Sequence, residues 1–292
     1  MNDDSLELPW SPSLTATQLK LFAMACMLID HIGAFLLPEE AALYPLCRTV
    51  GRLAFPIFCY LIAEGAERTR SLPPYMGRLG LFALVSTPPY NAVHGSPWYA
   101  LDQPNVFFTL LLGLTTIFTV KQAVPWLLCR LPQPRLADNR TVCLLPELPI
   151  CALLYLAAYA WHTDYGGYGV IAILLFWLLR EHPAAAWGCF ALITFVGYDF
   201  RLVQYIGGRV SDYCRMTPYD LCAHRVWLGG YTFRFQNARQ MAATLAMLPC
   251  LMYRGEKGRC SGWSKWAFYA FYPLHLTVIW LIQIAIVFFS DM

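Results

Sequence analysis

Residues 19–33 read LKLFAMACMLIDHIG, an apolar run that holds an acid and a base, Asp30 and His31, near its end. Extended to residues 18–37, the run has about the 20 residues that a helix needs to cross the hydrocarbon core of a bilayer. Ionisable side chains near the centre of such a helix cost about 2.5–3.5 kcal/mol each, so they need a partner or a water-filled cavity. The stretch therefore predicts a membrane helix that carries a polar site.

The composition of the whole chain agrees with this interpretation. Of the 292 residues, 58% are hydrophobic and 13% are charged, whereas soluble domains have about 45–50% and about 25%. The composition excludes a soluble or disordered protein, and a net charge of +3 without a run of Lys and Arg argues against nucleic-acid binding. We predict an all-α transmembrane bundle forming one domain over residues 1–292, with about nine spans. The spans are expected at residues 18–37, 46–66, 75–93, 105–124, 145–162, 166–180, 184–200, 238–253 and 266–289.

The basic residues of the short loops fall on one side of this arrangement, which predicts a cytoplasmic N-terminus by the positive-inside rule. Residues 201–239 also hold arginines and are interpreted as a long extracytoplasmic loop or insertion. Cys214 and Cys222 in that loop are candidates for a disulfide if it faces an oxidising compartment. The cysteines within apolar runs are expected to be packed free thiols. No Cys or His spacing typical of a metal site is present.

Charged residues inside the expected spans are the candidates for function. A helical rise of about 1.5 Å per residue places Asp30 and Arg52 at similar depths on antiparallel neighbours, so we expect them to meet. Glu64 follows Arg52 about 18 Å along the same helix, which is too far for direct pairing. The pair of Asp30 and Arg52 has two interpretations that the sequence leaves open. It either fixes helix packing or orients a substrate or a catalytic histidine.

His31 and His275 lie near the middle of the first and last expected spans. Each is readily explained as a helix-packing residue. A neutral imidazole is also the side chain best suited to general base catalysis near pH 7. Pro56 and Pro273 predict kinks in the second and last expected spans, and broken helices at membrane depth often line a cavity. Two histidines beside one cavity suit proton transfer in an enzyme and equally suit a proton-coupled transporter.

Several stretches, taken in this order, resemble the TraX family of integral membrane proteins. They are LKLFAMACMLIDHIG at 19–33, GRLAFPIFCYLIAEG at 51–65, NVFFTLLLG at 105–113, DYGGYG at 164–169, YRGEKG at 253–258 and FYAFYPLHL at 268–276. The resemblance covers most of the chain, and residues 201–236 lie outside it. At Arg254 this chain departs from the Asn of the family pattern.

The resemblance implies a membrane-embedded acyltransferase of a bacterial inner membrane. The donor it implies is cytoplasmic acetyl-CoA. The acceptor would be an amine or hydroxyl of a pilin-like protein, a glycan or a lipid of the envelope. A transporter or flippase with a midplane cavity is the alternative, and a non-catalytic assembly factor is a third interpretation.

For an acyltransferase we predict His31 as the general base, with Asp30 and Arg52 holding the geometry of the site. His275 or Tyr272 would stabilise the oxyanion or protonate the leaving thiolate. Direct transfer needs no metal and no covalent enzyme intermediate. The predicted substrate contacts are Arg52, Glu64, Tyr272, Asn105 and Tyr165.

Overall fold

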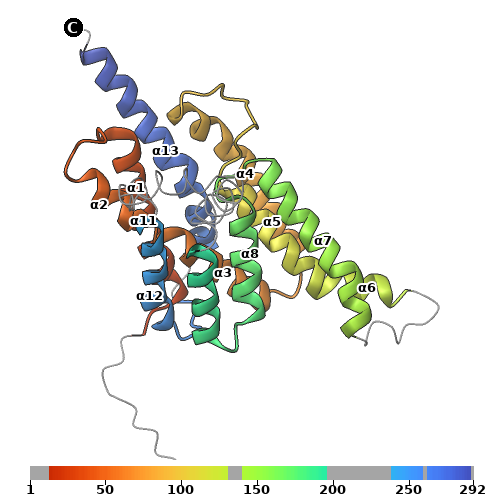
Figure 1. Ribbon diagram of the computed structural model, residues 1–292. Helices are drawn as coiled ribbons and strands as arrows, with labels where there is room; N and C mark the ends of the chain where they lie inside the picture. Colours follow the sequence, from red (N-terminus) through yellow and green to blue (C-terminus); the bar gives the residue numbers. More distant parts are fainter. Residues whose placement is uncertain (1–12, 131–139, 196–237, 259–261, 291–292) are drawn as a thin grey trace, which may run out of the picture.

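The computed structural model describes residues 13–130, 140–195, 238–258 and 262–290, and within these ranges the chain forms a bundle of α-helices (Figure 1). The predictions for Cys214 and Cys222 and for nearly all of residues 201–239 lie outside the described residues. The helices are α1 (Ala16–Leu36), α2 (Tyr44–Gly51), α3 (Ala54–Arg68), α4 (Pro73–Val93), α5 (Val106–Phe118), η1 (Thr119–Ala123), α6 (Val124–Leu128), α7 (Arg140–Ala160), α8 (Gly166–Leu178), α11 (Ala238–Met241), η4 (Ala242–Ala246), α12 (Met247–Leu251) and α13 (Gly262–Ser290).

Five helical stretches in the described ranges are long and apolar enough to cross a membrane, which confirms an all-α integral membrane protein. They are Ala16–Leu36, Tyr44–Arg68, Val106–Leu128, Val142–Ala160 and Trp266–Ser290. Three shorter apolar helices are Gly166–Leu178, Pro183–Phe195 and Ala242–Leu251. The count of about nine spans, the single domain and the cytoplasmic N-terminus stay predictions.

The centre of the bundle is formed by α3, α5 and α8, and the outer helices present apolar side chains to the surroundings. About half of the most apolar window of Tyr44–Arg68 and of Val106–Leu128 is buried, against 22% for α1 and for the apolar part of α13. Exposed side chains of α13 include Leu274 and Phe289. Such surfaces suit contact with lipid, in which apolar side chains are stable without burial in protein. The cysteines that the structure describes are free thiols.

Two glycines bring α1 and α2 close together. A Cβ on Gly51 would collide with the side chain of Asp30, and one on Gly33 would lie 2.5 Å from the Cβ of Cys47. The antiparallel register therefore sets Gly51 opposite Asp30. After Gly51 the helix is interrupted at Arg52 and Leu53, before α3 begins at Ala54. Pro56 explains the interruption, because its ring has no N–H and clashes with the carbonyl four residues earlier.

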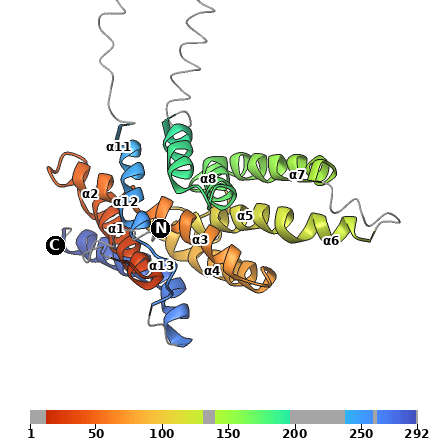
Figure 2. The same ribbon diagram turned by 90° about the horizontal axis from the view of Figure 1, so that it is seen from below.

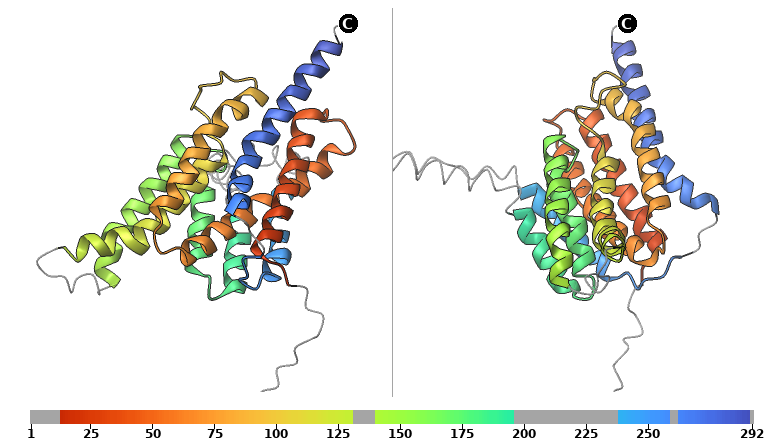
Figure 3. Two further views of the ribbon diagram at one scale, coloured as in Figure 1. Left: turned by 180° about the vertical axis from the view of Figure 1, so that it is seen from behind. Right: turned by 90° about the vertical axis from the view of Figure 1, so that its right-hand side faces the viewer.

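The last helix, α13, packs against two helices from the first third of the chain, α1 and α4. In two further views, α13 lies against α1 and α4 (Figure 3). It continues on both sides of Pro273. On the other side of the molecule, α5 and α6 run beside α7, as the view from below shows (Figure 2). Because α13 packs against α1, the first and last spans are neighbours, as a shared site for His31 and His275 requires.

Candidate functional site

A cavity of about 770 Å³ follows α1 along nearly its whole length. Its lining reaches from Ala16 to Phe35, which corresponds to about 28 Å of helical rise. Residues from α2, α3, α4, α5 and α13 form the other walls. The cavity therefore extends over about the thickness of a hydrocarbon core.

The two ends of the cavity differ in charge. One end, which we call the basic mouth, is lined by Lys20, Arg68, Arg78 and Lys257. The other end, which we call the polar chamber, contains Asp30, Arg48, Arg52, His94 and Asp164. Between them the walls are largely apolar, with Met24, Met27, Phe58, Leu61, Ile62 and Leu110.

His31 and His275 meet by hydrogen bonding between their rings. The distance from His31 Nδ1 to His275 Nε2 is 2.6 Å, and the two ring planes differ by 4°. The ring centroids are 4.9 Å apart, which exceeds the nitrogen separation by about one ring width, so the rings meet edge to edge. A lone pair of imidazole nitrogen lies in the ring plane, so this geometry suits an N–H···N bond.

The hydrogen bonds assign a tautomer to both rings. His275 Nδ1 lies 2.7 Å from the backbone oxygen of Phe271, which can only accept, so this nitrogen carries the proton. His275 Nε2 is then the acceptor, and His31 Nδ1 must be the donor. His31 Nε2 keeps its lone pair, and no hydrogen bond to it is found among the described residues.

Only the first of the two histidines faces the cavity. His31 lines it, whereas His275 is 7% exposed and is not among the lining residues. Because Nδ1 of His31 is turned toward His275, the edge that carries Nε2 is the one available to a ligand. The sequence placed both histidines beside one cavity, and the structure instead sets one behind the other.

The ion pair that the structure gives Asp30 is with Arg48, and the charge of Arg52 also acts on the Asp30 carboxylate, so the expected contact with Arg52 stays a prediction. Arg48 Nη1 lies 2.8 Å from Asp30 Oδ1 and 3.5 Å from the backbone oxygen of Asp30. The register sets Gly51 opposite Asp30, so Arg48, about one turn earlier, reaches the carboxylate. Arg52 lies in the same cavity. The polar chamber therefore holds two arginines whose charges act on Asp30.

Two predicted aromatic contacts line the cavity. Tyr272 is 3% exposed, and its ring centroid lies 6.2 Å from that of His31. Tyr165 stacks on Phe55 with centroids 3.5 Å apart. Both tyrosines are thus placed where a ligand can reach them.

The two remaining predicted contacts, Glu64 and Asn105, have partners within the protein. Glu64 lies toward the basic mouth and pairs with Arg68 at 3.2 Å, which agrees with its expected separation from Arg52. Asn105 is 1% exposed and does not line the cavity. It caps α5 by accepting from the Phe107 N–H and donates to the backbone oxygen of Ala83. We therefore do not assign Asn105 to substrate binding.

Asp164 and His94 were not singled out as site residues from the sequence. Asp164 belongs to the DYGGYG stretch, and the loop between α7 and α8 brings it to the cavity. Enclosure by the surrounding protein raises the pKa of Asp164 to about 6, although the charge of Arg52 opposes the shift. A carboxyl with a raised pKa at a cavity wall is a common sign of a functional site.

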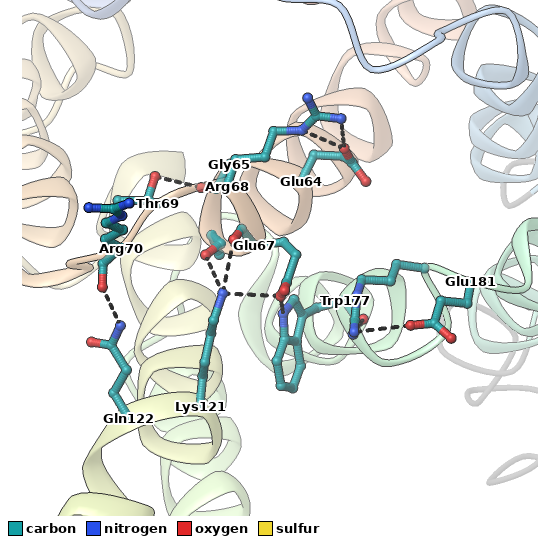
Figure 4. Close-up of polar contacts among 12 residues, drawn as sticks. Glu64, Gly65, Glu67, Arg68, Thr69, Arg70, Lys121, Gln122, Trp177 and Glu181 are labelled. Carbon is teal, nitrogen blue, oxygen red and sulfur yellow. Dashed lines mark hydrogen bonds and ion pairs between the residues drawn. The ribbon is translucent and has the colours of Figure 1, made fainter.

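A second polar cluster lies at the end of α3 (Figure 4). The Lys121 ammonium donates to the backbone oxygens of Ala66 and Glu67, each at 3.0 Å, and to the Glu67 carboxylate at 3.1 Å. The Trp177 indole donates to the same carboxylate at 3.0 Å. Lys121 lies in the π-helical turn η1. This cluster joins the C-terminal end of α3 to η1 and α8.

Comparison with known proteins places the chain in a family. Residues 15–283 match the profile of the family described as TraX protein. Over 161 residues the chain is 30% identical to a protein of Dichelobacter nodosus named "Probable fimbrial assembly protein FimC, serogroup H1". The match covers 55% of this chain and 61% of that relative. No solved structure matches the chain. Because the profile match extends over nearly all of the described helices, the chain belongs to the TraX family of proteins.

Proposed function

We propose that this protein is a membrane-embedded acyltransferase that uses acyl-CoA, with acetyl-CoA as the donor. The observation that carries the proposal is His31, an imidazole held in one tautomer with its lone pair available to a cavity that follows α1. A base fixed in this way is suited to take a proton from an attacking amine or hydroxyl.

The basic mouth suits the donor. Its lysines and arginines attract the phosphates of coenzyme A, and the positive-inside rule assigns this end to the cytoplasm. Lys20 and His31 lie about 16 Å apart along α1. The pantetheine arm has about 13 bonds between its phosphate and its sulfur, which span about 14–16 Å when extended. An arm anchored at Lys20 therefore brings the thioester to His31.

The reaction follows from the assigned tautomer. As the acceptor attacks the thioester carbon, His31 Nε2 takes the acceptor's proton, and the new imidazolium keeps its Nδ1–H bond to His275. When the C–S bond breaks, His31 returns that proton to the thiolate sulfur. Tyr272 would donate to the developing oxyanion, a role supported by its ring centroid lying 6.2 Å from that of His31. His275 acts through His31 as a positioning residue, in place of the oxyanion or acid role expected from the sequence.

The acceptor is proposed to reach the polar chamber from the other side of a bacterial inner membrane. The matched relative is named for fimbrial assembly. We therefore propose a pilus or envelope component, either a pilin-like protein or a glycan or lipid, as the acceptor.

A transporter is the second candidate, because the cavity follows almost the whole length of α1. Transport without chemistry predicts movement of a substrate that is recovered unchanged. Acyl transfer predicts consumption of the donor and a labelled product.

The test uses the purified full-length protein with radiolabelled acetyl-CoA and a bacterial membrane extract. Free CoA release is measured for wild type, His31→Ala and Gly77→Ala. The Gly77 variant serves as a control, because a methyl group added there would have no neighbouring atom within 4 Å. We expect release to fall about 10²-fold or more in His31→Ala alone. Equal release by all three proteins contradicts the proposed chemistry.

A further inference from the structure

His94 is a second imidazole in the cavity with an assigned tautomer. Its Nδ1 lies 2.7 Å from the backbone oxygen of Tyr90, so this nitrogen is the donor, and Nε2 carries a lone pair. No hydrogen bond to His94 Nε2 is found among the described residues. The residue is exposed and lines the cavity.

The position of His94 relative to His31 sets the two bases at different depths. Both rings pack on Phe35, with centroid distances of 5.7 Å for His31 and 4.9 Å for His94. His31 lies within α1 and is half-buried, whereas His94 is the exposed C-cap residue that follows α4. A helix C-terminus favours a positive charge. An acceptor entering the polar chamber past the end of α4 therefore meets His94 before it meets His31.

The chemistry of an amine acceptor requires two proton transfers. An α-amine has a pKa of about 7.7–8.0 and arrives mainly as an ammonium ion at neutral pH. It must lose one proton to become a nucleophile and a second when the amide forms. The sulfur of the departing coenzyme A takes the second proton, so one proton per turnover is released to water. A hydroxyl acceptor has only the second transfer to make.

We propose that His94 takes the first proton from an ammonium acceptor and releases it to water at the polar-chamber end of the cavity. This inference rests on the proposed function and concerns the amine acceptors that it allows. The His94 lone pair accepts the N–H proton, and the neutral amine then attacks the thioester carbon with His31 as base. The proton on His94 leaves to bulk water, so both histidines are neutral at the end of a cycle.

Other titratable and charged groups share this part of the cavity. They are Tyr90 on α4, Asp30 and His31 on α1, Tyr44 and Arg48 on α2, Arg52 after it, Asp164 and Tyr165 in the loop between α7 and α8, and Tyr272 on α13. Asp164 is the competing proton acceptor, so Asp164→Asn belongs in the same experiment.

The experiment compares two small acceptors that differ in one functional group. Glycinamide presents an ammonium ion, and glycolamide presents a hydroxyl in its place. Purified full-length protein is incubated with acetyl-CoA and either acceptor between pH 6 and 8.5, and thiol release and acetylated product are measured. The variants are His94→Asn, Asp164→Asn and the control His162→Asn. His162 also donates from Nδ1 to a backbone oxygen but does not line the cavity, and its φ of 55° suits asparagine.

For His94→Asn with glycinamide at pH 6.5, we expect a rate about 10-fold or more below wild type. The deficit should shrink toward pH 8.5, because the amine then arrives neutral, and added imidazole should restore the rate at pH 6.5. With glycolamide the same variant should match wild type, which also shows that it is folded.

Three results overturn the inference. An equal loss with both acceptors or at every pH indicates a structural role, and the same deficit in Asp164→Asn alone assigns the proton to the carboxylate. Unchanged rates in His94→Asn overturn the inference and leave the acyltransferase proposal standing. Absence of thiol release by wild type with both acceptors and with membrane extract contradicts the proposed function itself.

Discussion

Two polar clusters in the described part of the chain, one around Lys121 and one around His31, differ in how their hydrogen bonds are satisfied. In the cluster around Lys121, the ammonium is shared by two backbone oxygens and the Glu67 carboxylate, which also accepts from Trp177 (Figure 4). In the cluster around His31, the chain of hydrogen bonds from Phe271 through His275 ends on a nitrogen lone pair beside the cavity.

We propose that the contrast separates a structural role from a chemical one. Lys121 satisfies carbonyls at the end of α3, where helix termini lack intrahelical partners. His31 is instead oriented by its neighbours and keeps one unshared nitrogen for a ligand. Buried polar groups are normally satisfied within the protein, so a fixed histidine with a remaining acceptor is the better candidate for catalysis.

The largest effect that tests this contrast is expected at His275. His275→Leu removes the acceptor for His31 Nδ1–H, so the tautomer is no longer fixed, and we expect CoA release to fall about 10²-fold. His275→Gln offers a carbonyl oxygen as a substitute acceptor and should lose about 10-fold. Both rates are measured on protein whose melting temperature is recorded. Equal activity in His275→Leu and wild type contradicts the positioning role.

The Lys121 cluster should respond in stability and leave chemistry unchanged. Lys121→Met leaves two carbonyls and a carboxylate short of a donor, which should lower the free energy of unfolding by about 1–3 kcal/mol. We expect a lower melting temperature with an unchanged rate of CoA release per folded molecule. Lys121→Arg is the control, because it keeps a charged donor. A lower rate of CoA release in Lys121→Met with an unchanged melting temperature would contradict a purely structural role for the Lys121 cluster.

The close approach of α1 and α2 links packing to the site. A methyl group at Gly51 collides with the Asp30 side chain, so Gly51→Ala should disturb the pair of Asp30 and Arg48 and destabilise the protein by about 1–3 kcal/mol. We expect a several-fold slower CoA release as well. Gly77→Ala meets no neighbour within 4 Å and should be neutral or slightly stabilising. The two variants are compared by thermal melting and by rate.

The smallest effect is a pH dependence at Asp164. Its pKa in the folded protein is raised to about 6, so the folded state holds this proton more tightly than the unfolded state does. Stability from this group is therefore present at low pH and is lost as the pH rises from about 4 to about 6. Asp164→Asn should remove that part of the decline in melting temperature. Parallel curves for wild type and Asp164→Asn contradict the raised pKa.

Much of the fold was predictable because a membrane helix can be recognised from the local composition of the sequence. The expected span at 18–37 matches α1, and the one at 75–93 matches α4 within two residues. The expected break at Pro56 appears as the interruption after Gly51. The number of crossings was not decided in the same way, since short or less apolar helices such as α8 and α4 carry no unambiguous membrane signal.

Residue types and depth identified Asp30, His31 and His275 as the candidates of a site from the sequence alone, since charge within an apolar run is costly and visible. Tertiary structure decided their partners. Arg48 pairs with Asp30 because Gly51 sets the register of two helices, and His275 lies behind His31 because α13 packs against α1. Asp164 lies in a loop and His94 at a helix end, and both reach the cavity. In such segments the sequence has no hydrophobic periodicity from which the direction of a side chain could be predicted. Composition predicts which segments are apolar enough to lie in a bilayer, whereas the partners of each side chain depend on how helices distant in sequence pack together.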